Sequence, residues 1–394
     1  MAQVCNAPNR CSGRNRPETG DAMQSFKLTS WNIEHADKLL DAVSDSDATK
    51  ARHARARMAA IKDEISALGA DVLLICEGPC GEVRARTFFD EVAPDYELVV
   101  RGTDDADAYG MQGASGPFGR QWIWFLLRKG ARLRGQLLHL DQWQELTEVN
   151  SKGMHKDGSW PVSFPQLRDD RLEFAVDRSH SYWRHPQVLQ LDVDGHFCEV
   201  IGLHLKSKHT STRHDGGVSD DDFFARNPKL VAELIKDRTK ISTECADVRH
   251  YIEQRFAAQA SAAIIVGGDM NDGPAKERIE RRFMYHDLLG GLQGDVFFAR
   301  RFLNHALFDA PDGERWSVQF EDKLDPGRDP HILLDHVLFT QSFTNAVGVE
   351  PFAFKARRGG GKVEHEVHQR IAGPRPKYAT TSDHRPISMV FDRR

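Results

Sequence analysis

The sequence has no hydrophobic run near the ~20 residues that a membrane-spanning helix requires. The opening stretch MAQVCNAPNRCSGRNRPETGDAMQSF also lacks the apolar segment of a secretory signal. There are six cysteines but no CxxC pair, so disulfide staples are not indicated and a reducing compartment is favoured. P-loop, GxGxxG, HExxH and GxSxG patterns are missing as well. We therefore expect a cytoplasmic protein without a membrane span.

The charge balance has no excess of basic residues. Lys and Arg total 53, Asp and Glu total 58, and the formal net charge is -5. This balance does not favour a protein that coats nucleic acid non-specifically, but it leaves room for a local basic groove. With 394 residues, of which 40% are hydrophobic, the chain can bury a large core.

The N-terminal half begins with a strand–helix–strand pattern. Residues 26–32 form a predicted strand, and residues 49–68 have apolar side chains at helical spacing followed by Gly69 as a helix cap. The continuous apolar run 71–76 is typical of a strand covered on both faces. Further strands are predicted at 96–100, 122–127, 187–193, 197–205, 261–269, 332–340 and 387–391, and two helical stretches between about 219 and 258.

These elements predict an α/β fold, a four-layer sandwich of two packed β-sheets flanked by helices. We expect a disordered leader over 1–25 and one catalytic domain over 26–394, with insertions near 150–180 and 210–260. Polar, glycine-rich stretches are predicted to be loops on this domain and not linkers. They cover 102–120, 150–181, 206–222 and 355–380.

Several predicted strands end directly in polar side chains, which is where α/β folds gather their sites. Asn32 and Glu34 follow the first strand in SWNIEH, and Glu77 follows the next in LLICEGP. Mg²⁺ prefers oxygen ligands of this kind. For Glu77 taken alone, an exposed loop carboxylate is an equally good explanation.

The segment GGDMNDGP carries the sharpest signal. Asp269 and Asn271 are predicted to point to the same side of an extended chain, where a carboxylate could align water and an amide could hold a phosphoryl oxygen. Turn formation explains Asp272 and Gly273, but it does not explain Asp269 directly after IIVGG.

A second imidazole–carboxylate combination lies near the C-terminus. Asp383 and His384 precede the last strand in TSDHRPI, and Asp335 lies within the apolar strand ILLDHVLF. A buried carboxylate needs a partner, and His384 is the natural one for Asp335, although a structural salt bridge is the alternative. The neighbouring His336 is interpreted as a solvated or core histidine.

Basic residues near the fourth segment could contact phosphate. His204 ends a predicted strand in GLHLKSKH and is followed by Lys206 and Lys208, with Arg213 nearby. Arg184 in SYWRHPQV could bind phosphate in a bidentate manner. Taken alone, His204 is explained by a structural role and Arg184 by an ordinary surface arginine.

Taken in order, the segments SWNIE, LLICEG, WRHP, GLHLKS, GGDMND, LLDHV and SDHRPI resemble the endonuclease/exonuclease/phosphatase superfamily, which has the deoxyribonuclease I-like fold. The resemblance spans about residues 26–391. The segment HLKS stands where apurinic endonucleases have a tyrosine motif, and GGDMNDGP lacks the longer signature of the inositol polyphosphate 5-phosphatases. Those two branches are therefore disfavoured.

The resemblance implies a role for each matching residue. Glu77 would be the main Mg²⁺ ligand, beside Asn32 and the second acidic residue Glu34. Asp269 would orient the attacking water, Asn271 would hold the phosphate, and His384 would act with Asp335 as its partner and Asp383 as its neighbour. His204 and Arg184 would contact phosphate, and Lys206 and Lys208 would add positive charge.

The sequence thus predicts a metal-dependent hydrolase that cleaves phosphodiester bonds by direct attack of water, with Mg²⁺ as cofactor or Mn²⁺ in its place. A nuclease acting on nucleic acid is the first choice. Alternatives are a phosphatase or phosphodiesterase acting on a small phosphorylated molecule or lipid headgroup, and a catalytically inactive binding module on the same fold. No obligate protein partner is inferred.

Overall fold

The computed structural model describes residues 22–111, 120–147, 159–169, 171–208, 210, 222–283, 286–322, 324–325 and 327–394. Most of the leader expected over 1–25 lies outside these ranges, and so do Cys5, Cys11 and Arg213. The four cysteines within the described ranges, Cys76, Cys80, Cys198 and Cys245, are free thiols. No helix in the described part of the chain is long and apolar enough to cross a membrane.

The first sheet contains both ends of the described chain. Its strand order is β15-β16-β1-β2-β4-β3. The strands are β1 (Ser25–Asn32), β2 (Val72–Gly78), β3 (Tyr96–Val99), β4 (Trp122–Arg128), β15 (Phe354–Val363) and β16 (Ile387–Arg393). β1 and β2 are parallel and are joined through α1 (Ala36–Val43) and α2 (Ala48–Leu68), so the predicted strand–helix–strand start is confirmed.

Local sequence explains the limits of α2. The Asp47 side chain accepts hydrogen bonds from the backbone N–H groups of Thr49 and Lys50, which caps the first turn. Gly69 ends the helix with a φ of 59°, a left-handed conformation that glycine adopts at little cost. The predicted apolar face is buried, since Met58 and Ile65 are both about 1% exposed.

The second sheet has the order β11-β14-β10-β9-β8-β5. Its strands are β5 (Leu133–Leu137), β8 (Gln187–Val193), β9 (His196–His204), β10 (Ile264–Asp269), β11 (Asn304–His305) and β14 (Asp335–Phe339). β8 and β9 form a hairpin, in which Asp194 and Gly195 make the turn with φ values of 52° and 91°. β9 and β10 are parallel, which aligns their C-terminal ends.

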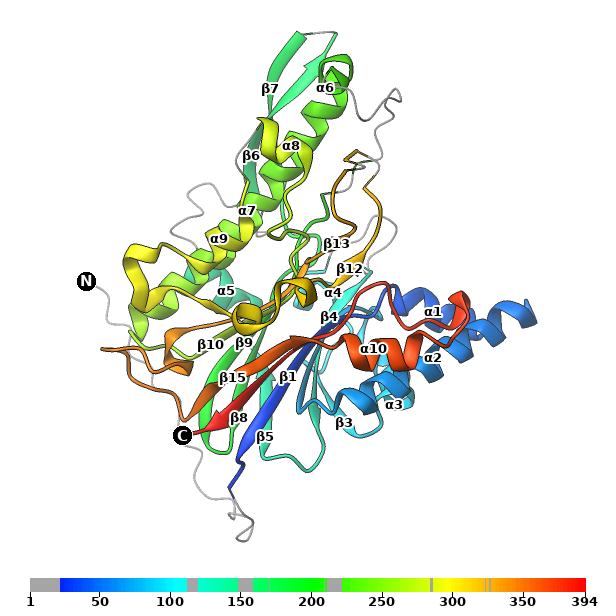
Figure 1. Cartoon of the computed structure of the whole chain (residues 1–394), viewed down its shortest axis with the longest axis vertical. Helices are drawn as coiled ribbons and strands as arrows, with labels where there is room; N and C mark the ends of the chain where they lie inside the picture. The colour runs from blue at the N-terminus through cyan, green and yellow to red at the C-terminus, as the bar shows by residue number, and fades with distance from the viewer. Residues whose placement is uncertain are drawn as a thin grey trace.

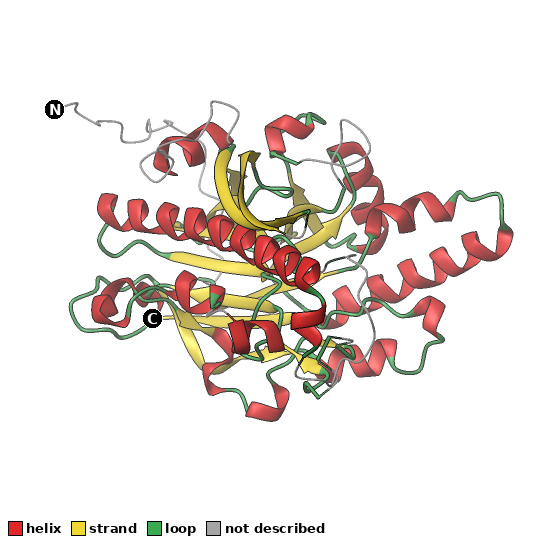
Figure 2. Cartoon of the chain, turned by 90° about the horizontal axis from the view of Figure 1, so that it is seen from above, coloured by secondary structure: helices red, strands yellow, loops and turns green. Residues whose placement is uncertain are grey.

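The two sheets pack face to face, with helices outside them (Figures 1 and 2). An ideal Cβ on Gly202 of the second sheet would lie 2.7 Å from Leu74 of the first, so the sheets approach closely there. The outer face of the second sheet is covered by α7 (Pro228–Ala258), α5 (Leu140–Thr147) and α9 (Leu288–Gln293). The outer face of the first sheet is covered by α2 and α3 (Glu82–Val92). The predicted fold class is confirmed.

The remaining elements are short. They are α4 (Ala106–Tyr109), α6 (Phe223–Arg226), α8 (Arg278–Phe283), α10 (His365–Ala372), β12 (Val318–Gln319), β13 (His331–Ile332) and the 3-10 turns η1 (Val296–Arg301), η2 (Ala306–Asp309), η3 (Asp312–Glu314), η4 (Gln341–Phe343) and η5 (Lys377–Ala379). α6 and α7 confirm the two helical stretches expected between about 219 and 258.

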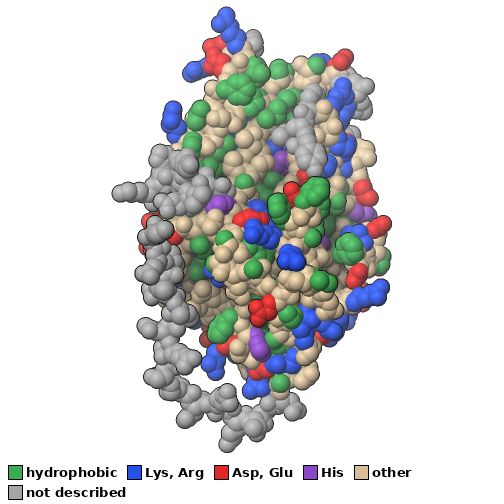
Figure 3. Space-filling view, turned by 90° about the vertical axis from the view of Figure 1, so that its left-hand side faces the viewer, with side chains coloured by type: hydrophobic (Ala, Val, Ile, Leu, Met, Phe, Trp, Pro, Cys, Tyr) green, Lys and Arg blue, Asp and Glu red, His purple; other side chains and the backbone are tan. Residues whose placement is uncertain are grey.

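The prediction of a loop over 150–181 is wrong for its described part. β6 (Trp160–Arg168) and β7 (Arg171–His180) form a hairpin that packs on α7 and extends away from the sandwich (Figure 1). Val162 and Phe164 are buried, whereas the other face of the hairpin exposes Phe174 by 79%. Figure 3 shows hydrophobic side chains at this upper end of the molecule. The prolines and polar residues of this segment hid the strand pattern.

The prediction of a loop over 355–380 is also wrong. β15 pairs with β16 along the edge of the first sheet, with an irregularity between Ala356 and Gly361, and α10 follows. An edge strand can accommodate a glycine-rich bulge because only one side of it is paired.

Candidate active site

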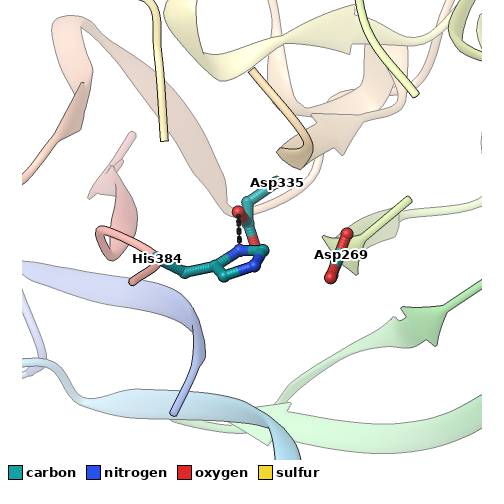
Figure 4. Close-up of side chains that lie close together, drawn as sticks. All are labelled: Asp269, Asp335 and His384. Atoms are coloured by element: carbon teal, nitrogen blue, oxygen red, sulfur yellow. Dashed lines mark hydrogen bonds and ion pairs between the residues drawn. The ribbon is translucent and has the colours of Figure 1, made fainter. Parts of the chain in front are cut away.

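The polar residues at the strand ends converge where the two sheets meet. In the second sheet, Asp269 at the end of β10 lies opposite His204 of β9 and Asp335 of β14. In the first sheet, Asn32 ends β1 and Glu77 is the penultimate residue of the neighbouring strand β2. His384 precedes β16 and reaches the same place, as Figure 4 shows for its position beside Asp335 and Asp269.

Asn32 connects the two sheets through its side-chain amide. Its Nδ2 atom donates to Glu77 Oε1 at 3.2 Å and to Asp269 Oδ2 at 3.0 Å. The residue is 1% exposed, so these bonds are shielded from water. One amide therefore fixes the distance between the two carboxylates predicted to bind a cation and to align water.

Glu77 is held as an ionised carboxylate. Burial would raise its pKa, but hydrogen bonds from the ring and the backbone N–H of His35 outweigh this and hold the pKa below its ordinary range. The carboxylate is 12% exposed and therefore remains accessible from the cleft. The carboxylate oxygens of Glu77 and Asp269 suit a hard divalent cation such as Mg²⁺ or Mn²⁺. Asn32 directs its amide nitrogen at both carboxylates, so only its Oδ1 atom, which accepts from the backbone N–H of Glu34, could add a further oxygen ligand.

Glu34 takes a different direction from the one expected. Its backbone has a φ of 48°, and its carboxylate lies 3.1 Å from the guanidinium of Arg57. Arg57 also donates to the carbonyls of Ile33 and Thr381, which fixes it beside Glu34. Glu34 is thus engaged by an arginine, whereas Asn32 and Glu77 lie together.

The geometry predicted for Asp269 and Asn271 is wrong in one respect. The chain is not extended there, because Asn271 has a φ of 51°. Instead, the backbone N–H of Asn271 donates to Asp269 Oδ1 at 2.9 Å, and its side-chain Nδ2 donates to the carbonyl of Leu205 at 2.9 Å. A tight turn therefore brings Asn271 back toward the strand ends, which keeps both residues at the site.

Asp269 is the buried carboxylate of the site. Burial and the nearby charge of Asp335 raise the pKa of Asp269 to about 7, although bonds from Asn271 and Asn32 oppose the shift. A carboxylate with such a pKa can accept a proton near neutrality, which an ordinary aspartate does poorly.

His384 and Asp335 form the predicted pair. Nδ1 of His384 donates to Asp335 Oδ2 at 2.7 Å, and Asp335 is fully buried. Burial would lower the pKa of His384, but the charge and hydrogen bond of Asp335 raise it to about 10. His384 is therefore an imidazolium at neutral pH. Asp383 lies at the rim, 66% exposed and 4.0 Å from Nε2 of His384.

His204 provides a neutral imidazole. Burial and the positive charge of Arg184 lower the pKa of His204 well below its ordinary value. Its Nε2 lies 3.6 Å from Asp269 Oδ2, and its buried Nδ1 has no hydrogen-bond partner among the described residues. The two histidines of the site thus differ in charge.

The three predicted substrate contacts have different surroundings. Arg184 is 8% exposed and donates to the carbonyls of His204 and Leu205, so it supports the strand end from within. Lys206 pairs with Asp237 at 2.7 Å and is 28% exposed. The prediction that Lys208 adds positive charge for a phosphate is wrong. Its ammonium is buried and lies 2.8 Å from Asp272 and 2.8 Å from Glu280, so it neutralises acids inside the protein and does not face a substrate.

Sequence reasoning missed two residues of the site. Nδ1 of His35 lies 2.9 Å from Glu77 Oε2, and Gln121 bonds to Arg184 Nη1 and to His35. His35 and Gln121 both have a left-handed backbone conformation, which could not be predicted from the sequence. Five of the seven non-glycine residues with a positive φ in the described chain surround this site, and strained backbone is typical of functional sites. They are Glu34, His35, Glu77, Gln121 and Asn271.

Two clusters in the described residues have the spacing of metal ligands. In the first, Asp269, Asp335 and His384, the imidazolium of His384 already offsets the charge of the carboxylates. In the second, Asp272, Glu280 and His286, the ammonium of Lys208 takes the place of a cation. Neither fits a cation as well as the oxygens around Glu77.

Comparison with known proteins gives matches among solved structures alone. No protein-family model and no curated protein matches the chain. Truncated TDP2 from Caenorhabditis elegans is 13% identical, with 93% of this chain and 98% of that chain covered and a TM-score of 0.45. An endonuclease/exonuclease/phosphatase family protein from Bacteroides thetaiotaomicron is 12% identical, with 93% and 97% covered and a TM-score of 0.45. The catalytic domain of human Nocturnin is 14% identical, with 94% of each chain covered and a TM-score of 0.43.

The Bacteroides protein is described as a member of the family that the sequence motifs resemble. With TM-scores below 0.5, these likenesses assign no role to any residue. The fold class follows from the two packed sheets, and the chemistry has to be argued from the contacts within the site.

Proposed function

We propose that the chain is a divalent-cation-dependent phosphodiesterase of the endonuclease/exonuclease/phosphatase superfamily, which cleaves a P–O bond by direct attack of water. The observation that carries the proposal is the Asn32 bridge. A single buried amide holds the ionised Glu77 and the basic Asp269 3.2 Å and 3.0 Å from its nitrogen, although they belong to different sheets. A purely structural amide has no need to join two carboxylates.

Asp269 would align the attacking water and accept its proton. The raised pKa of Asp269, about 7, suits this task near neutral pH. Asn271 lies in the turn that donates to Asp269, and the bond from its Nδ2 to the carbonyl of Leu205 fixes its carboxamide beside the site, where its oxygen would orient the substrate or the attacking water. Glu77 and Asn32 would hold Mg²⁺ or Mn²⁺, which would supply charge stabilisation at the phosphoryl and leaving oxygens.

Two histidines would stabilise the negative charge that develops on the phosphoryl oxygens. His384 is kept protonated by Asp335 and can donate a charged hydrogen bond through Nε2. His204 is neutral and donates or accepts without adding charge. Asp383 at the rim would limit the approach of further anions to His384.

For substrate, we propose a nucleic-acid strand in preference to a small phosphorylated molecule. With Lys206 and Lys208 paired to acids, the support comes from a groove of about 320 Å³ that begins at His35. Its basic and aromatic lining residues are His35, Lys38, Lys50, His53, Arg57 and Tyr378. Tyr378 stacks on His53 with ring centroids 3.8 Å apart and is 49% exposed, which suits stacking with an unpaired base.

The test is hydrolysis of plasmid DNA, single-stranded DNA, RNA and a panel of phosphomonoesters, with and without Mg²⁺ or Mn²⁺. Asp269→Ala should abolish turnover, whereas Asp312→Asn, on an aspartate that is 93% exposed, should behave as wild type. Cleavage that persists in Asp269→Ala would point to a contaminating nuclease.

The outcomes separate the alternatives. Turnover of monoesters or lipid headgroups without nucleic-acid cleavage would move the function to a phosphatase or a small-molecule phosphodiesterase. Binding of nucleic acid without turnover of any substrate would indicate an inactive binding module. The proposal requires that cleavage of a phosphodiester depends on both the cation and Asp269.

A further inference from the structure

Arg385, which directly follows His384, has a guanidinium without an acidic partner. Its Cζ atom lies 3.7 Å from the ring centroid of Trp316, so the guanidinium stacks on the indole. Its Nε atom is buried and has no hydrogen-bond partner, and Arg385 forms no ion pair with any described residue. Asp383, the acid nearest in sequence, lies beside His384 instead, and the nearby Arg57 is already paired with an acid. The charge of Arg385 is therefore available for a ligand.

The protein compensates the charge of Arg385 only in part. The side chain is half-buried, and burial lowers its pKa. The carboxylate that opposes this shift belongs to Glu64, which is fully buried and accepts a hydrogen bond from Nδ1 of His368 at 3.0 Å. Stacking on the indole offsets part of the cost of burial, but the N–H groups of a guanidinium still need acceptors. An anionic ligand would supply them.

The backbone connects Arg385 to the pair formed by His384 and Asp335. The N–H of Arg385 donates to the carbonyl of Ser317 at 2.8 Å, and Oγ of Ser317 accepts from the backbone N–H of Asp335 at 3.1 Å. Ser317 directly follows Trp316, so the indole is fixed to the same backbone. The Cα atoms of His384 and Arg385 are ~3.8 Å apart, as for any consecutive residues. An anion on Arg385 would therefore lie next to the phosphate proposed to bind at His384.

Trp316 is itself held in place by two histidines. The rings of His331 and His365 pack on it with centroid distances of 4.2 Å and 4.5 Å. Nε2 of His365 donates to the carbonyl of Glu314 at 2.8 Å, which fixes that ring. The indole thus holds the guanidinium of Arg385 in one orientation before a ligand arrives, which reduces the entropy lost on binding.

We propose that Arg385, held on Trp316, binds a second phosphate of the substrate, next to the phosphate that is cleaved. A guanidinium presents its N–H donors in a planar fork that matches phosphate oxygens, and stacking leaves the edge of this fork free. A nucleic-acid strand has two adjacent phosphates, whereas a single phosphodiester has one. The inference rests on the proposed function and adds that the site recognises a strand.

The first test measures binding of fluorescein-labelled decathymidylate by the full chain in EDTA, where a cation-dependent enzyme does not turn over. Arg385→Gln should weaken binding roughly tenfold, because it removes a charged hydrogen bond. It should also make the dependence of log Kd on log salt concentration shallower by about 0.7, the share of one phosphate contact on a single strand. Arg358→Gln removes the same charge from an exposed arginine of β15 and should bind as wild type with an unchanged salt dependence.

Trp316→Leu tests whether the indole acts through Arg385. It should weaken binding of decathymidylate in wild type but have little further effect in Arg385→Gln, because it removes only the support of the guanidinium. Fully additive losses would overturn this role of Trp316. Thermal unfolding checks that each variant is folded, and if Trp316→Leu does not fold, Arg385→Gln carries the test by itself.

Hydrolysis separates this inference from the proposed function. With Mg²⁺ or Mn²⁺, wild type should have a lower KM for the thymidine trinucleoside with two phosphates than for thymidylyl-thymidine, which has one. Arg385→Gln should lose this difference while its kcat for thymidylyl-thymidine stays unchanged. Equal KM values in wild type, or unchanged decathymidylate binding in Arg385→Gln, would overturn the inference and leave the proposed function standing. Failure of wild type to cleave any phosphodiester would overturn both.

Discussion

Oδ2 of Asp335, in a strand of the second sheet, accepts a hydrogen bond at 2.7 Å from Nδ1 of His384, in the segment that leads into the first sheet. Asp335 begins β14, and His384 precedes β16, where the indole of Trp31 also donates to the carbonyl of His384 at 3.0 Å. Oδ1 of Asp335 has no hydrogen-bond partner among the described residues, so His384 is the main neutralising group for this buried charge.

Asp335→Asn should therefore impair hydrolysis with little loss of fold. The amide oxygen can still accept from Nδ1, but the charge that keeps His384 protonated is lost, so the pKa of His384 falls. We expect kcat to drop by roughly 10²-fold or more, the scale of a positioned acid–base group. Steady-state kinetics on whichever phosphodiester the wild type cleaves would measure kcat. A kcat within twofold of that of Asp312→Asn would contradict the role of the pair.

The dependence of rate on pH should be bell-shaped. Asp269 must be ionised, which gives a rise around its pKa of about 7, and His384 must be protonated, which gives a fall around its pKa of about 10. Because Asp335 raises both values, both limbs should move to lower pH in Asp335→Asn. A descending limb that stays in place in this variant would show that another group is responsible for it.

How far the sequence could predict the site depends on backbone direction. Carboxylates and imidazoles that directly follow apolar strands were predictable, because strand ends in one sheet share an edge. The contact of His35 with Glu77 was not predictable, because it depends on a left-handed backbone at Glu34 and His35 that no local sequence pattern indicates. A helical stretch such as α2 was predictable from its periodicity and its caps.

Lys208 shows why the roles of charged residues are harder to predict from sequence than the fold. Its partners Asp272 and Glu280 lie more than sixty residues away in sequence, and their burial depends on the packing of α7 and α8. From sequence, a lysine beside a phosphate-site histidine is equally consistent with substrate binding and with an internal ion pair. The prediction of the two-sheet fold rests on many apolar strands, so it survives errors in single segments. The prediction of a role for one lysine has no such support.

Asp269→Asn should stabilise the protein in a pH-dependent way. The pKa of Asp269 is about 7 in the folded state and ~3.9 in the unfolded chain, so wild type loses stability as the pH rises from about 4 to about 7. Asparagine cannot ionise, so the stability of the variant does not fall in this way. Its free energy of unfolding should therefore exceed that of wild type by an amount that grows from about pH 4 to about pH 7 and remains constant above that range. We expect a difference on the order of a few kcal/mol, measured by urea unfolding at pH 4, 5.5, 7 and 8.5. An advantage that does not change with pH would contradict the buried charge.

The two lysines near the site should respond differently to substitution. Lys208→Met leaves Asp272 and Glu280 without one buried cation and should cost about 3–5 kcal/mol of folding stability. Lys206→Met breaks a partly exposed pair with Asp237 and should cost about 0–1 kcal/mol. Denaturant unfolding compares them directly, and equal losses would show that the burial of Lys208 is incorrect. A higher KM in Lys206→Met alone would support its predicted contact with substrate.

Gly268→Ala should disrupt the site through the backbone. Gly268 has a φ of 132°, and a Cβ built there would lie 1.8 Å from the carbonyl oxygen of Leu203. That carbonyl belongs to β9 directly before His204, and Gly268 directly precedes Asp269, so relief of the clash must separate these two site residues. We expect a stability loss above about 4 kcal/mol or failure to fold, the range of the most damaging single substitutions.

The neighbouring glycine provides the matched control for this effect. A Cβ on Gly267 would lie 3.1 Å from a side-chain carbon of Leu74, which can move, and its φ is not in the left-handed region. Gly267→Ala should therefore cost about 1–3 kcal/mol and retain activity. Thermal unfolding and hydrolysis would be measured for both variants. If Gly268→Ala folded and worked as well as Gly267→Ala, the parallel pairing of β9 and β10 at their C-terminal ends, on which the juxtaposition of His204 and Asp269 depends, would have to be wrong.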